Sequence, residues 1–324
     1  MKITDVLVEK FIELRYWYAK HLDHPRFQLW RKCLTFIIVG ISLWFIWNQF
    51  FSGYTTLIEI DLRFDPRFLL LSWLCVSSAT ILGAWEWSML VSALDVDFDI
   101  LKGMRVGVVS NLAKYIPGSI WSYVGKAYGA TKLGIPKSVA GLSIVLEFGI
   151  LYSTGFLMML LLIPASGCLN LFSGHQWIAQ TSVIFFVILI CIKLPNFVRK
   201  IILRLGITEY RGFVLKGFDW HRFTVVFVAV LLTWGLLGIG FVLLIMSMMN
   251  FDWYWIPRVI LAMTVALLLG QIAFFVPMGV GIREAIFIAM LQPVAHPSLI
   301  VVLALAFRVE SLVGEVFAAF LGYI

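Results

Sequence analysis

A proline–glycine pair, Pro117-Gly118, is the feature that most constrains how this chain can fold. Asn111 and Lys114 precede the pair, Trp121 follows it, and long apolar runs lie on either side. A helix that crosses a membrane cannot continue through such a pair. Irregular backbone at membrane depth is tolerated only where protein or a water-filled cavity surrounds it. We therefore expect this segment to form the turn of a re-entrant helical hairpin.

The composition indicates a membrane protein. Of the 324 residues, 61% are hydrophobic and 13% are charged, whereas soluble domains have roughly 45–50% apolar and about 25% charged residues. Apolar runs of about 20 residues, the length that crosses a bilayer, recur along the sequence. The sequence therefore predicts an all-α polytopic membrane protein.

The formal net charge of +7 is explained by topology rather than by nucleic-acid binding. The basic residues are concentrated in two segments beside apolar runs, residues 2–32 and 199–222, which is typical of cytoplasmic loops. We expect no nucleic-acid partner, a location in the inner (cytoplasmic) membrane, and cytoplasmic N- and C-termini. The four cysteines show no CxxC spacing, so we expect neither a zinc site nor a disulfide framework.

The chain divides into a leader and a transmembrane domain. Residues 1–33 have apolar side chains at helical spacing opposite basic ones, which predicts an amphipathic helix on the cytoplasmic leaflet; a solvated leader helix is the alternative. No early apolar core is present, so we expect no cleavable signal peptide. Residues 34–324 form the transmembrane domain, whose expected full spans cover about 34–51, 68–94, 138–163, 176–194, 223–249 and 297–323.

Two parts of this domain, about residues 68–163 and 223–324, follow one plan. In each, a span is followed by one arm, a break, a short second arm and a span with an ionisable residue. Glu147 follows Pro117 by 30 residues, and Arg308 follows Pro277 of the second break by 31.

The two copies are expected to have opposite orientations, because three crossings separate their starts. Inverted repeats with broken helices that meet near the midplane are common in transporters. We therefore expect about six transmembrane helices plus two re-entrant helical hairpins in an inverted repeat. The alternative is an ordinary bundle in which either broken segment crosses as a kinked span.

The breaks are candidate binding sites for a lipid phosphate. A helix that begins inside the membrane directs free N–H groups and the positive end of its dipole at the space in front of it. Lys114, Lys126 and Arg283 lie near such starts in the sequence. The alternative is that the glycines only allow close helix packing.

Five ionisable residues lie inside predicted spans: Glu86, Glu147, Arg308, Glu310 and Glu315. An uncompensated charge at the bilayer centre costs at least about 2.5–3.5 kcal/mol, so all five should face the protein interior. Glu147 and Glu310 are the better candidates for lining a polar path or carrying a proton. Arg308 and Glu315 lie on one helical face, where a structural ion pair between them is an alternative. Glu86, between two tryptophans, is expected to be a packed or interfacial group.

The sequence contains none of the common motifs of nucleophilic, nucleotide-dependent or zinc-dependent catalysis, such as G-x-S-x-G, the P-loop or H-E-x-x-H. No soluble segment is large enough to hold a cofactor or a nucleotide. We therefore expect no enzymatic activity, no metal and no cofactor.

The two breaks resemble the signatures of one family, the lysylphosphatidylglycerol synthase transmembrane-region family, whose members are also called flippase-like proteins. The signature N-x-x-K-Y-x-P-G-x-x-W is matched by Asn111, Lys114, Tyr115, Pro117, Gly118 and Trp121. The signature P-x-G-x-G-x-R-E is matched by Pro277, Gly279, Gly281, Arg283 and Glu284. Arg308 followed by Gly314-Glu315 is similar to the family's final-helix pattern, and the resemblance extends over most of the chain from about Leu34.

This resemblance implies lipid transport. In the best-known members the region is the membrane half of the multiple peptide resistance factor, which is taken to move aminoacylated phosphatidylglycerol to the outer leaflet. The chain ends at Ile324 without an aminoacyl-transferase domain, so we expect no lipid aminoacylation. Stand-alone members resemble proteins associated with glycosyltransferases and cell-envelope glycan assembly, which leaves the identity of the lipid open.

We therefore expect a flippase-type transporter that moves an anionic phospholipid or a polyprenyl-phosphate lipid through a central cavity. The expected site comprises the residues of both signatures together with Glu147, Arg308 and Glu310. Lys114 and Arg283 would attract the phosphate, while Glu147 and Glu310 would attract a cationic group or couple protons. The alternatives are a non-transporting subunit that scaffolds or feeds a lipid-linked glycosyltransferase, and an enzyme acting on lipid head groups. A homodimer is left open.

Overall fold

The structure is a computed structural model that describes residues 64–94, 99–115, 121–167, 219–273 and 279–323. Every regular element in these ranges is a helix, as predicted. The elements are α4 (Pro66–Ala93), α5 (Ile100–Asn111), η1 (Leu112–Tyr115), α6 (Trp121–Lys132), α7 (Lys137–Leu162), α11 (Trp220–Met248), η3 (Trp253–Trp255), α12 (Ile256–Ile272), α13 (Ile282–Leu291) and α14 (Pro297–Tyr323).

Several predictions lie outside the described residues. These are the amphipathic segment 1–33, the spans at 34–51 and 176–194, and the three break residues Pro117, Gly118 and Pro277.

Four of the described helices are long and apolar enough to cross a membrane: Pro66–Ala93, Val139–Leu162, Trp220–Met248 and Trp253–Ile272. The first three correspond to spans expected from the sequence. The fourth contains the first arm of the second predicted hairpin, which the sequence predicted to be re-entrant. The chain is therefore a multi-pass membrane protein, and this arm alone is long enough to span.

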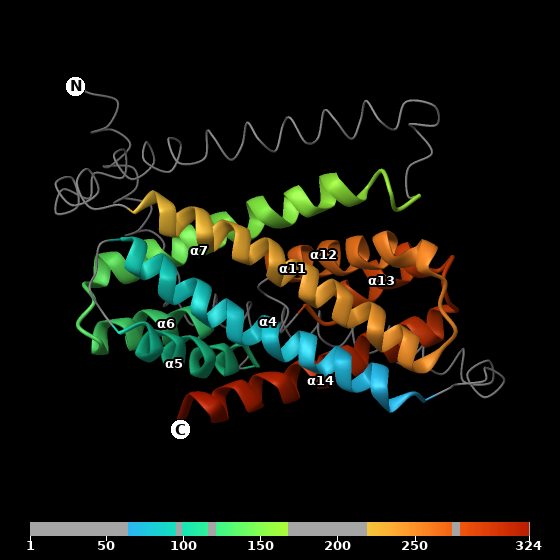
Figure 1. Ribbon diagram of the computed structural model, residues 1–324, viewed down its shortest axis with the longest axis horizontal. Coiled ribbons are helices and arrows are strands. Elements are labelled where there is room, and N and C mark those ends of the chain that lie inside the picture. The colour runs from blue at the N-terminus through green and yellow to red at the C-terminus, as the bar shows by residue number, and fades with distance from the viewer. Residues whose placement is uncertain (1–63, 95–98, 116–120, 168–218, 274–278, 324) are drawn as a thin grey trace, which may run out of the picture.

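The two longest helices, α4 and α11, pack antiparallel against each other through the centre of the molecule (Figure 1). The backbone N–H of Asp65 donates to the carbonyl of Ser247 at 2.9 Å, and that of Asp219 donates to the carbonyl of Ala93 at 3.0 Å. Each helix therefore begins where the other ends.

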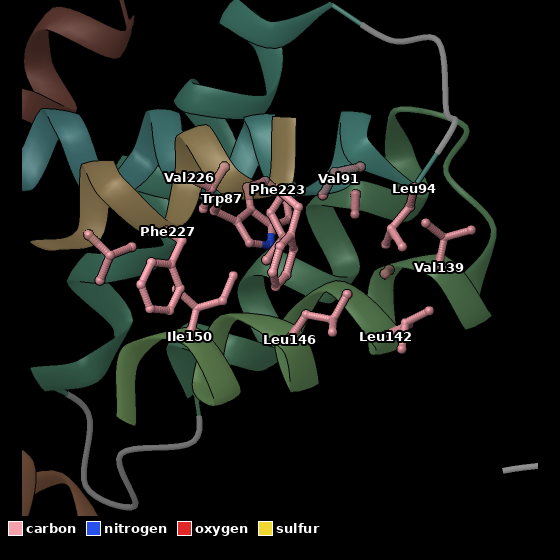
Figure 2. Close-up of a cluster of buried hydrophobic side chains, with 14 of the residues drawn as sticks. Trp87, Val91, Leu94, Val139, Leu142, Leu146, Ile150, Phe223, Val226 and Phe227 are labelled. Atoms are coloured by element: carbon pink, nitrogen blue, oxygen red, sulfur yellow. The ribbon is translucent and has the colours of Figure 1, made fainter. Parts of the chain in front are cut away.

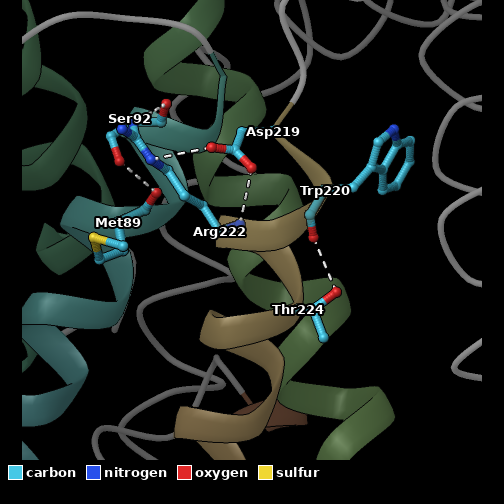
Figure 3. Close-up of polar contacts among 6 residues, drawn as sticks. All are labelled: Met89, Ser92, Asp219, Trp220, Arg222 and Thr224. Atoms are coloured by element: carbon cyan, nitrogen blue, oxygen red, sulfur yellow. Dashed lines mark hydrogen bonds and ion pairs between the residues drawn. The ribbon is translucent and has the colours of Figure 1, made fainter.

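Both helices also begin with the same N-cap. The Asp65 side chain accepts from the backbone N–H of Arg67, and the Asp219 side chain accepts from that of Arg222. A carboxylate at this position satisfies one of the free N–H groups of the first turn. Figure 3 shows that the Arg222 guanidinium then reaches back to the Ser92 carbonyl, at 3.2 Å, and joins the start of α11 to the end of α4.

Two helical hairpins lie at opposite ends of the α4–α11 pair. In Figure 1, α5 and α6 lie at the end where α4 finishes, whereas α12 and α13 lie at the end where α11 finishes. The helix after each hairpin packs against the first arm of the other one, since α7 contacts α12 and α14 contacts α5. We use the word tip for η1 in the first hairpin and for residues 279–281 in the second. This arrangement brings both tips toward the middle of the long helices.

Two large hydrophobic clusters hold the described helices together. The first, shown in Figure 2, packs α4, α7 and α11 around Trp87, which is 1% exposed. The second surrounds Phe241 of α11, whose ring contacts Phe287 of α13 and Phe307 of α14 at centroid distances of 4.8 and 5.2 Å. Each hairpin end of the molecule thus has its own core, and Leu267 of α12 packs against both.

Candidate functional site

A cavity of about 730 Å³ lies between the tips of the hairpins and the long helices. Its volume falls within the range of about 300–1,000 Å³ that is typical of small-molecule sites. Seven charged side chains line it: Glu86, Lys114, Lys126, Glu147, Arg283, Arg308 and Glu315. The amides Asn111 and Gln271, which lie near the inner ends of α5 and α12, also line it.

Lys126 and Glu147 form an ion pair on the α6–α7 side of the cavity. Their Nζ and Oε1 atoms lie 2.5 Å apart, and the lysine side chain is only 5% exposed. The Lys126 ammonium also lies 5.9 Å from the ring centre of Trp87 and 6.0 Å from that of Tyr123. Aromatic faces attract a cation at this distance. The aromatic rings and Glu147 together explain how a lysine is tolerated in the interior of the protein.

A second ion pair joins the tip of the first hairpin to the last helix. Lys114 of η1 donates to Oε1 of Glu315 on α14, and Glu315 is almost fully buried. This contact holds η1 at the wall of the cavity.

A third ion pair joins the tip of the second hairpin to the same helix. Nη2 of Arg308 lies 2.9 Å from Oε1 of Glu284, which is completely buried. The other oxygen of Glu284 accepts from the backbone N–H of Gly281 at 2.7 Å and so caps α13. The sequence suggested that the start of α13 offers free N–H groups to a phosphate. Instead, a carboxylate of α13 itself already occupies the first of them.

The alternative suggested by the sequence, an ion pair between Arg308 and Glu315, is therefore wrong. Both residues lie on one face of α14, but each pairs with a different hairpin. Separation by seven residues shows only that two side chains point the same way, and it does not determine their partners.

Arg283 differs from the other three cations of the cavity, because no described residue forms a hydrogen bond or an ion pair with it. Its Nε atom is buried without a partner. The side chain lies against Gly270 of α12, where an added Cβ would come within 2.6 Å of that nitrogen. Arg283 is therefore the cavity cation with which no described carboxylate forms a direct ion pair.

Glu86 also lines the cavity, although the sequence suggested a packed or interfacial group. The hydroxyl of Thr233 on α11 donates to Oε1 of Glu86 at 2.5 Å. Other cavity residues of α4, including Ala79, Gly83 and Leu90, lie one or two turns from Glu86 on the same helical face. This stripe at spacings of three and four residues is the sequence signal that could have identified Glu86.

Several further polar atoms of the cavity wall are buried without a hydrogen bond, which is uncommon in folded proteins. Within the part of the chain that the structure describes, they are Nε1 of Trp87, Oε2 of Glu147 and Oε1 of Gln271. These donors and acceptors are available to a polar ligand.

The model of one protein family, described as Lysylphosphatidylglycerol synthase TM region, matches residues 34–318. The chain belongs to this family. No curated protein and no solved structure matched the chain. Membership in the Lysylphosphatidylglycerol synthase TM region family, together with the four candidate spans, identifies a multi-pass membrane protein of lipid-related function.

The structure places four of the residues that match this family's signatures, Asn111, Lys114, Tyr115 and Arg283, in the wall of the cavity. Six predicted site residues line the cavity: Asn111, Lys114, Tyr115, Glu147, Arg283 and Arg308. Glu284 forms an ion pair with Arg308 but does not itself line the cavity. Trp121 is 49% exposed and does not line the cavity. Glu310 is buried outside the cavity and contacts Ser72.

The signature glycines shape the tip of the second hairpin. Gly279 and Gly281 have φ angles of 64° and 85°, a region that favours glycine. A Cβ on Gly279 would lie 2.8 Å from the Cα of Gly270. Close helix packing, the alternative considered from the sequence, therefore explains Gly279.

Proposed function

We propose that this protein is a lipid transporter of flippase type, which moves a phosphate-bearing lipid between leaflets through the cavity at the hairpin tips. The observation that carries this proposal is Arg283, a cavity cation with no described carboxylate or hydrogen-bond partner. A guanidinium forms strong, charge-assisted hydrogen bonds with a phosphate. Family membership supports the lipid-related part of the proposal.

The lipid head group enters the cavity while its hydrocarbon chains stay in the bilayer. Arg283 binds the phosphate, and Lys114 contributes a second cation that is 38% exposed and reachable by exchange of its Glu315 partner. The carboxylates of Glu86 and Glu147 face the same space from α4 and α7. An anionic phospholipid and a polyprenyl-phosphate lipid both have the required phosphate. No step in this transport needs an enzymatic reaction.

We further propose that the two halves form an inverted repeat with re-entrant hairpins in the inner membrane. The antiparallel α4–α11 pair and the hairpins at its opposite ends support this arrangement. With 12, 12 and 10 residues, α5, α6 and α13 extend about 15–18 Å each, which is too short for a hydrocarbon core of about 30 Å. The remaining arm, α12, belongs to a segment that is long enough to cross, so the proposal for the second hairpin rests on α13. Two such hairpins entering from opposite sides would give the cavity access to both leaflets in turn.

The test is transfer of labelled lipids between the leaflets of proteoliposomes that contain the purified protein. Arg283→Gln should reduce the transfer rate of a labelled anionic phospholipid by about tenfold or more, since one charge-assisted bond contributes roughly 1.5–3 kcal/mol. Arg283→Lys keeps the charge and should retain part of the activity. Lys102→Gln, which removes a lysine whose side chain is 64% exposed on α5, is the matched control and should behave like wild type.

Two results would contradict the proposal. One is equal transfer by wild type and Arg283→Gln. The other is equal transfer of a labelled diacylglycerol, which has the same chains and no phosphate. Absence of any transfer, together with stable co-purification with a lipid-linked glycosyltransferase, would instead favour the non-transporting subunit.

A further inference from the structure

Glu310 is a buried carboxyl group that the proposed lipid site does not use. It lies on α14, is 7% exposed, and does not line the cavity. Its Oε2 atom lies 2.9 Å from the hydroxyl oxygen of Ser72 on α4, and Oε1 is buried without a hydrogen bond to any described residue. No described cation forms an ion pair with it.

The contacts of Ser72 determine how many protons this cluster needs. The Ser72 hydroxyl oxygen lies 2.7 Å from the carbonyl oxygen of Gly240 on α11 as well as 2.9 Å from Glu310. Three oxygen atoms in a row, at these two distances, are joined by two hydrogen bonds and therefore need two protons. A serine hydroxyl has one proton and a backbone carbonyl has none.

The second proton must therefore come from Glu310. If Ser72 donates to the Gly240 carbonyl, the protonated carboxyl of Glu310 donates to Ser72, and both contacts are satisfied. If Glu310 were ionised, Ser72 could donate to only one neighbour, and the other contact would bring two acceptors together without a proton. We propose that Glu310 is a proton-binding site of this protein, and that in this structure it holds the proton.

Glu86 shows that this result does not apply to every buried carboxyl group. There the Thr233 hydroxyl has one described acceptor, Oε1 of Glu86, so a single proton satisfies the contact. An ionised Glu86 fits its surroundings, whereas an ionised Glu310 does not.

The surroundings of Glu310 contain few groups that could compete for the proton. From α4, Ser72 and the thiol of Cys75 face it, and α11 contributes the Gly240 carbonyl. Within the described residues no charged side chain forms an ion pair with Glu310. The groups that exchange the proton are therefore Glu310 itself and, at high pH, Cys75.

Release of this proton would act on the cavity through α14. Arg308 and Ser311, which flank Glu310 in the sequence, both line the cavity, while Glu310 holds the same helix against α4 and α11. Deprotonation breaks this three-helix contact and so changes how α14 is held. Coupling of the proton to lipid movement rests on the proposed function, but the proton site itself does not.

Infrared spectroscopy of the purified protein tests the proton site directly, because a protonated carboxyl group has a C=O stretching band that a carboxylate lacks. The difference spectrum of wild type minus Glu310→Gln at neutral pH should contain this band. Glutamine keeps a neutral donor for Ser72, so the variant should fold. In a Glu86→Gln control the band should remain, and Ser72→Ala should shift it, because the carboxyl group then loses its hydrogen bond.

Absence of the band from the difference spectrum would overturn the proposal, whatever the lipid assay shows. Coupling has its own test in proteoliposomes: a pH gradient should change the transfer rate severalfold in wild type and not in Glu310→Gln. If the pH gradient does not change the transfer rate of the wild type, coupling is overturned. That result would not contradict the proton site.

Discussion

Arg308 and Glu315 lie two helical turns apart on α14, and each forms an ion pair with the tip of a different hairpin. Arg308 pairs with Glu284 of α13, and Glu315 pairs with Lys114 of η1. One helix thus holds both sides of the cavity through charges of opposite sign. A change in the position of α14 would therefore alter the ion pairs at both hairpins.

The Lys114–Glu315 contact should be measurable as a coupling energy. In a double-mutant cycle with Lys114→Met and Glu315→Gln, we expect about 0.5–3 kcal/mol of coupling in thermal or denaturant unfolding of the detergent-solubilised protein. The exposed Lys102–Asp99 pair has side chains that are 64% and 47% exposed. Lys102→Met should change stability by less than about 0.5 kcal/mol. Additive effects of the first two substitutions would show that the pair contributes nothing.

Glu284 should be the most sensitive carboxylate of the site. It is completely buried, holds Arg308 and caps α13. Because Glu284→Ala leaves Arg308 without its partner, we expect a loss of about 3–5 kcal/mol in the free energy of unfolding. Glu284→Gln keeps the cap acceptor and should lose less. Equal losses in the two variants would mean that the cap hydrogen bond contributes nothing and that the loss comes from the ion pair with Arg308.

Gly279→Ala should be destabilising for two reasons that reinforce each other. The new Cβ would lie 2.8 Å from the Cα of Gly270, in a residue whose φ is 64°. Strain of this backbone alone costs about 1–3 kcal/mol, and the collision adds to it. Gly235 of α11 is the control, since an added Cβ there meets nothing within 4 Å. Gly235→Ala should be neutral or stabilising by up to about 1 kcal/mol, and the melting temperatures of the two variants should differ clearly.

The N-caps of the two long helices should contribute similarly. Because each aspartate accepts from a backbone N–H in the first turn, Asp65→Ala and Asp219→Ala should each cost about 0.5–2 kcal/mol in unfolding experiments. Asp252 precedes η3 without a side-chain cap bond, so Asp252→Ala should have little effect. A cost at Asp252 equal to the other two would argue against capping as the cause.

The sequence predicted the long helices well. The expected spans 68–94, 138–163 and 223–249 correspond to Pro66–Ala93, Lys137–Leu162 and Trp220–Met248. Apolar length and flanking polar residues determine these boundaries, and both are local properties of the sequence.

The partners of the charged residues could not be predicted in the same way. Lys114 lies 201 residues from Glu315, and Thr233 lies 147 residues from Glu86. Helical periodicity gives the direction of a side chain on its own helix but contains no information on which other helix it meets. For this reason the sequence suggests a packed or interfacial Glu86 and an ion pair of Arg308 with Glu315, whereas the structure has neither arrangement.

The two backbone hydrogen bonds between α4 and α11 have a consequence for motion. Sliding one helix along the other by a single turn, about 5.4 Å, would break the Asp65–Ser247 and Asp219–Ala93 bonds together. The contacts at the hairpin tips are side-chain ion pairs, which water or an ionic ligand can replace. We therefore expect α4 and α11 to keep their positions relative to each other. In a rearrangement, the hairpins would move relative to this central pair.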